Sequence, residues 1–195
     1  MITLISVGAI VGIIIAVLVV ILVFAIIGCY NGLVQLRNKV KNAWSQIDVQ
    51  LKRRFDMIPN LVETVKGYAA HEESIFGEFA KARGLYAQAS KDGNVEGMAE
   101  ANKGLSGALS RLLVVQERYP ELKANSNFQT LMSNLKETED KISYTRQFYN
   151  DVVLKYNNKV EMFPGNIVAK MFNFKVAAFF EVTSEEQREA PKVKF

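Results

Sequence analysis

The feature that most constrains the fold is a long uncharged stretch at the amino terminus. None of residues 1–36 is charged, and nearly all of residues 2–27 are aliphatic. About 26 helical residues, rising about 1.5 Å each, make a rod of about 39 Å, whereas the hydrocarbon core of a bilayer is about 30 Å thick. We therefore predict that residues 1–29 form a transmembrane anchor.

The same stretch has two other interpretations, a cleaved secretory signal and a lipoprotein signal. A cleaved secretory signal has a positive start and a short apolar core, but no Lys or Arg precedes this run, so we expect it to be retained. Residues 26–29 also match a loose lipoprotein box, in which Cys29 would carry the lipid. The single cysteine cannot form an internal disulfide.

The charge balance is basic, with a net charge of +4. The excess lies soon after the span, at Arg37, Lys39, Lys41, Lys52, Arg53 and Arg54. These side chains are candidates for contact with lipid headgroups, although for Lys52, Arg53 and Arg54 an ordinary solvated face is the favoured interpretation. A nucleic-acid partner is not expected, because the aromatic-plus-basic patterns of such binders are missing from the sequence.

Orientation follows from the same charges. Arg37, Lys39 and Lys41 follow the span and no basic residue precedes it, so the positive-inside bias predicts an external amino terminus and a cytoplasmic domain. A periplasmic domain is the alternative. Within the span, Gly8, Gly12 and Ala16 recur every four residues, a spacing that lets membrane helices approach closely. We predict an oligomer interface there, against the alternative that small residues are simply common in such helices.

Apolar residues recur every three or four positions through most of the remaining chain, which predicts helices. The first pattern runs over residues 33–69, continuous with the span except for a weak joint at Gly28 and Gly32, and Pro59 predicts a kink over residues 55–58. A second helix follows residue 70, a loop covers residues 90–94, and a third helix covers residues 95–115. Three glycines weaken that third helix.

The last long helix has the most regular apolar seam and is predicted over residues 126–163. A short apolar piece at 167–180 follows this helix, and we expect it to close the open end of the bundle, with a contact for a second subunit or for the membrane surface as the alternatives. The helix begins with a capping box of Ser126 and Gln129, and Pro164 ends it. Its seam is typical of a coiled coil and consists of Phe128, Leu131, Leu135, Thr138, Ile142, Thr145, Tyr149, Val152, Tyr156, Val160 and Phe163. We predict an all-α fold, in which the anchor leads into an antiparallel four-helix bundle with long first and last helices at 30–182, followed by a charged tail at 183–195.

Catalytic groups are sparse. A zinc site of the HExxH type needs two histidines, and His71 stands alone. We expect no enzyme activity, no metal and no cofactor. A buried polar network that fixes helix register is predicted instead, with a ligand site built from the same residues as the alternative. Its members are Asn38, Asp48, Arg54, Asn60, Glu63, Thr138, Thr145 and Arg146.

Several stretches of the sequence, each with a particular order of polar and apolar residues, carry a family resemblance. They include residues 43–54, 58–68 and 119–122, together with Tyr30, Asn31, Leu33, Val34, Arg37, Asn38, Thr138, Glu139, Tyr149, Asn150, Tyr156, Asn157, Phe163, Pro164 and Asn166. This order resembles the signature of the LemA family, from residue 30 to the end of the chain. The resemblance implies a bacterial single-pass membrane protein with a helical bundle and no established enzyme activity, and some members of the family shape magnetosome membranes.

Together these features predict a non-enzymatic scaffold in the bacterial inner membrane. We expect its partners to be membrane lipid and further copies of the chain, which would assemble to organise or bend the bilayer. The alternative is an adaptor or sensor that binds another envelope protein, such as a protease or kinase, through the third helix. A hydrolase is the remaining class, for which the sequence offers no constellation of residues.

Overall fold

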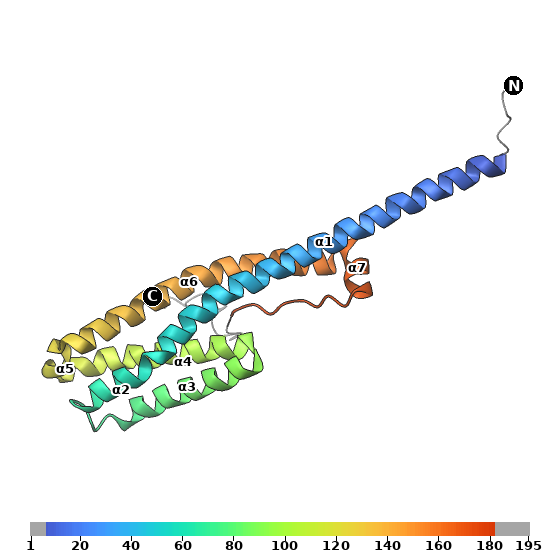
Figure 1. Ribbon diagram of the computed structural model, residues 1–195. Coiled ribbons are helices and arrows are strands. Elements are labelled where there is room, and N and C mark those ends of the chain that lie inside the picture. Colours follow the sequence, from blue (N-terminus) through green and yellow to red (C-terminus); the bar gives the residue numbers. More distant parts are fainter. Residues whose placement is uncertain (1–6, 182–195) are drawn as a thin grey trace, which may run out of the picture. The chain divides into compact units, whose positions relative to one another are not determined.

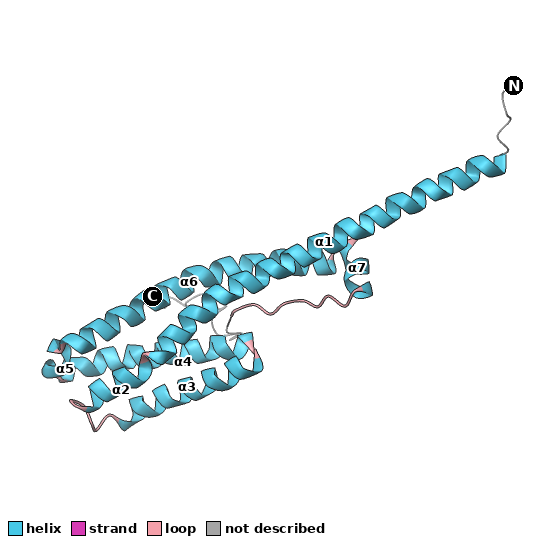
Figure 2. Cartoon of the chain, in the orientation of Figure 1, coloured by secondary structure: helices cyan, strands magenta, loops and turns pink. Residues whose placement is uncertain are grey.

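A computed structural model describes residues 7–181 of the chain. Over that range the chain is helical apart from turns and one extended segment, and no strand occurs (Figure 2). The predicted all-α class and the long amino-terminal apolar helix are therefore confirmed. The start of the span and the charged tail at 183–195 lie outside the described residues.

The chain divides into two compact units. The described part of the first unit comprises residues 7–42 and 152–177, and that of the second comprises residues 43–151 and 178–181. Two long helices, α1 (Val7–Asp56) and α6 (Ser126–Glu161), contribute residues to both units (Figure 1).

The first unit contains the apolar half of α1, the end of α6, and α7 (Gly165–Met171). Gly28 and Gly32 do not interrupt α1, so the predicted continuity of the span with the first helix of the domain is confirmed. Tyr30 lies 4.8 Å from the ring of Phe172 and 5.7 Å from that of Phe174, between ring centroids. These contacts attach the segment after α7 to the helix that emerges from the span.

The second unit contains the end of α1, then α2 (Ile58–Lys66), α3 (Glu73–Asp92) and α4 (Val95–Val115). A 3₁₀ turn, η1 (Gln116–Arg118), and the short α5 (Pro120–Ala124) lead into α6. Helices α3 and α4 lie side by side (Figure 1). The turn between them is short because Gly93 adopts a positive φ of 65° and Asn94 caps α4 by accepting from the N–H of Gly97.

The α4 boundaries agree with the prediction, but three local details differ. The predicted loop at 90–94 is mostly helix, because α3 continues to Asp92. The predicted capping box at Ser126 is wrong, since Asn125 caps α6 by accepting from the N–H of Phe128 at 2.9 Å. Phe163 is 79% exposed beyond the end of α6 and so does not belong to its buried seam.

The helix is interrupted before Pro59, within the predicted stretch, but by an end of α1 and not by the kink in one continuous helix that the sequence predicts. Helix α1 ends at Asp56, Met57 is a turn residue, and Pro59 lies in the first turn of α2. A proline has no N–H, so it fits the first turn of a helix, where that donor would have no partner inside the helix. The interruption therefore falls within the predicted stretch.

An extended strap, residues 172–181, follows α7 and is held by two Tyr-Asn pairs seven residues apart on α6. In the first unit, Tyr156 donates to the carbonyl of Lys175 at 2.8 Å, and Asn157 bonds to both the N–H and the carbonyl of Ala177. In the second unit, Tyr149 donates to the carbonyl of Ala178, and Asn150 accepts from the N–H of Phe180.

The strap also contributes apolar side chains. Phe180 is 2% exposed and lies against Trp44 in the second unit, whereas Phe174 is buried in the first. Part of the predicted apolar piece at 167–180 therefore closes the core of the chain itself. Phe172 remains half exposed.

Candidate functional site

The amino-terminal part of α1 presents an exposed apolar surface. Its large side chains between Ile10 and Phe24 are 47–69% exposed, and this is the one helix among the described residues that is long and apolar enough to cross a membrane. Gly8, Gly12 and Ala16 are exposed on it, with open space around Gly12. The surface fits a hydrocarbon environment, because exposed apolar area on this scale is unfavourable in water.

The predicted headgroup residues divide into two groups by burial. Arg37, Lys39 and Lys41 are exposed in the first unit, and Lys52 and Arg53 are exposed in the second. Arg54 is 2% exposed, so its assignment to lipid headgroups is wrong. Helical geometry explains the difference, because Arg54 lies on the same face as the buried Leu51 and Ile58.

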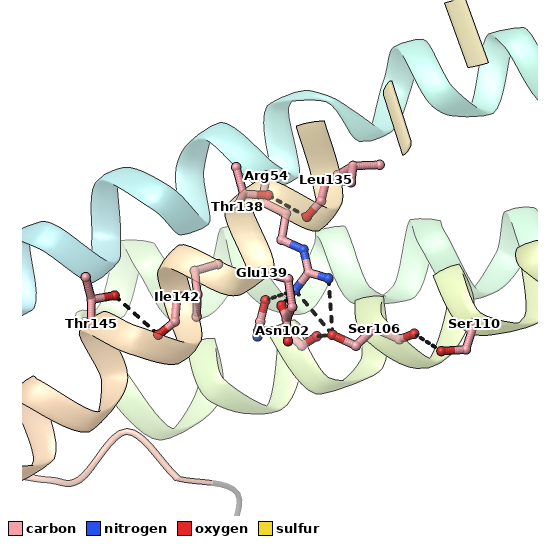
Figure 3. Close-up of polar contacts among 9 residues, drawn as sticks. All are labelled: Arg54, Asn102, Ser106, Ser110, Leu135, Thr138, Glu139, Ile142 and Thr145. Atoms are coloured by element: carbon pink, nitrogen blue, oxygen red, sulfur yellow. Dashed lines mark hydrogen bonds and ion pairs between the residues drawn. The ribbon is translucent and has the colours of Figure 1, made fainter. Parts of the chain in front are cut away.

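Arg54 is the centre of a polar cluster inside the second unit (Figure 3). Its Nη1 donates to the carboxylate of Glu139 on α6 and to the side-chain oxygen of Asn102 on α4. Both Nη atoms also lie 3.2 Å from the hydroxyl of Ser106. The guanidinium of α1 thus joins side chains from two other helices.

Burial and charge pairing act in opposite directions on the pKa of Arg54. Burial lowers the pKa of Arg54, and the negative charge of Glu139 partly restores it. Nε of Arg54 is buried and has no hydrogen-bond partner. Glu139 is the less buried partner, with its side chain 40% exposed. The arginine is therefore fixed, and the carboxylate lies at the edge of the cluster.

The predicted buried polar network is only partly present. Arg54 and Thr138 are buried, and Thr138 donates to the carbonyl of Leu135 in its own helix. Asp48 and Thr145 are half-buried. The prediction was wrong for the exposed members, which are Asn38, Asn60, Glu63 and Arg146.

Three partners of Arg54 were absent from the predicted network, namely Asn102, Ser106 and Glu139. They lie 48 to 85 positions along the chain from the arginine, so no local spacing links them. Asn102 offered one signal, because it lies three residues before Leu105 on the apolar face of α4.

A groove of about 500 Å³ opens beside the cluster in the second unit. Arg54, Ser106 and Glu139 lie at one end, and apolar side chains of α4 and α6 form much of the remaining wall. The apolar lining consists of Leu109, Leu113, Met132 and Leu135. Ser110, Ser133 and Lys136 complete the lining. A mostly apolar wall with a few polar groups is the usual form of a small-molecule site.

A second groove, of about 740 Å³, is formed by α1 and α6 residues of the second unit. It is lined by Ser45, Gln46, Val49, Gln50, Glu137, Asp140, Lys141, Tyr144 and Thr145. Val49 and Tyr144 are 59% and 78% exposed. This face therefore combines two exposed apolar side chains with polar and charged ones.

The described residues show no group of three or more His, Cys, Asp or Glu side chains placed to hold a metal. His71 is exposed just before α3. Its neighbour Glu72 accepts from the guanidinium of Arg118 at 3.0 Å and from the hydroxyl of Tyr119 at 3.2 Å. Glu72 therefore links the start of α3 to the segment between α4 and α5.

Comparison with known proteins places these features in a family context. The LemA family model matches residues 43–195. Magnetosome protein MamQ 2 of Paramagnetospirillum magneticum is 28% identical over 78% of this chain, and the match covers 64% of that relative. Protein LemA of Metamycoplasma hominis is 26% identical over 84% of this chain and 74% of its own length. The chain thus spans less than two thirds of the length of the MamQ relative.

Proposed function

The chain belongs to the LemA family, and we propose that it is a non-enzymatic, membrane-anchored scaffold that self-assembles and organises or shapes the bacterial membrane. The observation that carries the proposal is α1, which continues from an apolar surface into the helical domain without a break. A stiff anchor of this kind transmits the packing of membrane helices to the domain they carry.

The helical domain of this proposal is an antiparallel four-helix bundle. The second unit holds segments of α1, α3, α4 and α6, the number that such a bundle requires. Arg54 supports the arrangement because its side chain connects three of these helices. The coiled-coil character of α6 belongs to the same proposal.

We assign self-assembly to the stripe of Gly8, Gly12 and Ala16, because these small, exposed residues let two helices approach closely. In this proposal, anionic lipid headgroups bind to Arg37, Lys39 and Lys41. Lys52 and Arg53 are further candidates for such contacts. The amino terminus is placed outside and the domain in the cytoplasm by the positive-inside bias. The MamQ relatives are named magnetosome proteins, which supports a role at a membrane.

The test is reconstitution of the full chain into vesicles of phosphatidylethanolamine and phosphatidylglycerol. We expect crosslinked oligomers and vesicles whose shape changes in electron micrographs. Gly12→Leu should abolish the oligomers, whereas Ile14→Leu, on another face of the same helix, should preserve them. A chain that remains monomeric and leaves vesicles spherical would contradict the proposal.

The second candidate is an adaptor that binds another envelope protein. It is favoured by exposed apolar side chains on α4, where Leu113 and Val114 are 46% and 71% exposed. Affinity purification separates the two candidates, because an adaptor recovers one stoichiometric partner and does so without self-association. Loss of that partner on Val114→Asp, with the oligomeric state unchanged, would favour the adaptor.

A further inference from the structure

The groove beside Arg54 has a cationic polar end, and its wall away from that end is apolar except for the hydroxyls of Ser110 and Ser133. Over their lining residues, α4 from Ser106 to Leu113 and α6 from Met132 to Glu139 each span about 10 Å, at about 1.5 Å per residue. Arg54, Ser106 and Glu139 are joined by hydrogen bonds at one end, and Leu113 and Met132 lie towards the other ends of the same helical stretches.

The charge of the lining favours an anion. Arg54 and Lys136 contribute two positive charges, against one negative charge from Glu139. The guanidinium already holds a carboxylate, that of Glu139, and its buried Nε has no partner. An arginine fork binds a carboxylate through two parallel N–H bonds, so one donor of this fork is unused.

The carboxylate now in place can leave. Glu139 is 40% exposed, so its own carboxylate can turn into water, and the incoming carboxylate then pairs the buried charge of Arg54. Leu113 is 46% exposed at the apolar end, so hydrocarbon laid along the groove would remove it from water. Asn102 and Ser106 would still hold the arginine in place.

We infer that this groove binds a fatty acid, whose carboxylate replaces that of Glu139 at Arg54 and whose chain lies on Leu109, Leu113, Met132 and Leu135. The size agrees, because about 500 Å³ falls within the range of small-molecule sites. This inference goes beyond the scaffold function and does not depend on self-assembly.

The test uses the full chain in phosphatidylcholine vesicles with a photoactivatable fatty acid. We expect crosslinks on peptides that contain Leu113 or Met132. Excess oleate should remove the label, and oleyl alcohol, which has the same chain without the charge, should not. Equal competition by the alcohol, or label spread evenly over the domain, would overturn the inference.

Variants separate binding from a purely structural role of the cluster. Glu139→Gln removes the internal competitor and should increase labelling at least threefold; a purely structural ion pair predicts no increase. Leu113→Glu places a negative charge at the apolar end and should reduce labelling at least tenfold. Val114→Glu is the matched control, since Val114 is more exposed and does not line the groove, and it should label normally.

Two further outcomes test whether the polar group of the ligand is a carboxylate and whether the groove holds its hydrocarbon chain. If lysophosphatidate competes better than oleate, the assignment to a carboxylate is wrong. If Leu113→Glu and Val114→Glu reduce labelling equally, the groove does not hold the chain. Because the readout is a mapped crosslink, neither result bears on whether the protein assembles or bends membranes.

Discussion

Removing an arginine side chain from water costs free energy unless its charge is paired. Arg54 has partners that offset this cost. Its guanidinium is removed from water but receives Glu139, Asn102 and Ser106 as partners from two other helices. Removing the arginine removes the desolvated charge together with its bonds. Removing Glu139 leaves the charge buried with neutral partners only, which is the more costly change.

Glu139→Ala should therefore destabilise the domain more than Arg54→Met does. We expect a loss of about 1–3 kcal/mol for Glu139→Ala, below the full cost of breaking a buried pair because Glu139 is partly exposed. The measurement is the urea midpoint of the full chain in detergent, followed by circular dichroism. Glu137→Ala, which breaks only an exposed pair with Lys141, should leave the midpoint unchanged. The reverse order of the first two variants would contradict the argument.

Tyr149 gives the domain a defined sensitivity to alkali. Burial raises the pKa of Tyr149 to about 12, from about 10 in an unfolded chain. Between pH about 10 and about 12, Tyr149 keeps its proton in the folded state but loses it in the unfolded state. Its contribution to stability is therefore complete below pH about 10 and is lost as the pH rises towards about 12. Burial also raises the pKa of Tyr86 and Tyr156, so among the seven tyrosines the late part of the tyrosinate absorbance should become smaller in Tyr149→Phe. A titration that Tyr149→Phe leaves unchanged would refute the assignment.

At this scale the sequence predicted the types of residue better than their partners. Arg54 was assigned both to headgroups and to a buried network, because its spacing on α1 does not reveal which other helices surround it. Asn60 and Glu63 lie in the same stretch of sequence but are exposed on α2. Contacts over 48 to 85 positions depend on how helices are placed, which local periodicity does not encode.

At the scale of the element, the glycines of α4 are not equivalent. A Cβ at Gly97 would lie 2.9 Å from that of Ala89 on α3, whereas a Cβ at Gly107 meets nothing within 4 Å. Gly97→Ala should cost about 1–3 kcal/mol through overpacking, and Gly107→Ala should stabilise the helix by about 0.5–1 kcal/mol. Thermal unfolding of the two variants tests the contrast, and a gain in both would show that α3 and α4 are free to separate.

The strap depends on side chains of α6 for its hydrogen bonds. Asn157→Leu removes two bonds to Ala177, worth about 1–3 kcal/mol together, so the amide of Ala177 should exchange its hydrogen at least about fivefold faster. Asn158→Leu, at the exposed neighbouring position, is the control. Mass spectrometry of exchanged peptides measures both. Equal protection in the two variants would mean that apolar contacts alone hold the strap.

Helix existence was predictable because periodicity reports which face is buried. The bounds of α4 agreed, and α6 began at the expected residue, but its cap was assigned one residue too late. The strap was recognised only as apolar, since nothing local indicates that Tyr149, Asn150, Tyr156 and Asn157 bind backbone groups about 20 to 30 positions away.

At the scale of the whole molecule, the decisive property is the continuity of α1. The sequence indicated a weak joint at Gly28 and Gly32, but the helix passes through both residues. A Cβ at Gly28 would meet nothing, and one at Gly32 would make only an ordinary contact with Lys159. Neither glycine is therefore needed for packing, and alanine at both positions should be tolerated.

This continuity allows a tether to be distinguished from a rod. A flexible Gly-Ser insertion after Gly28 leaves the span and the domain intact but uncouples their orientation, so vesicle reshaping should be lost while membrane insertion and crosslinking within the span persist. A helical insertion of seven residues, about two turns, nearly restores the facing of the two parts and should retain reshaping. If the flexible insertion reshapes vesicles as well as the unmodified chain does, α1 acts only as a tether, and the membrane effect must arise in the domain alone.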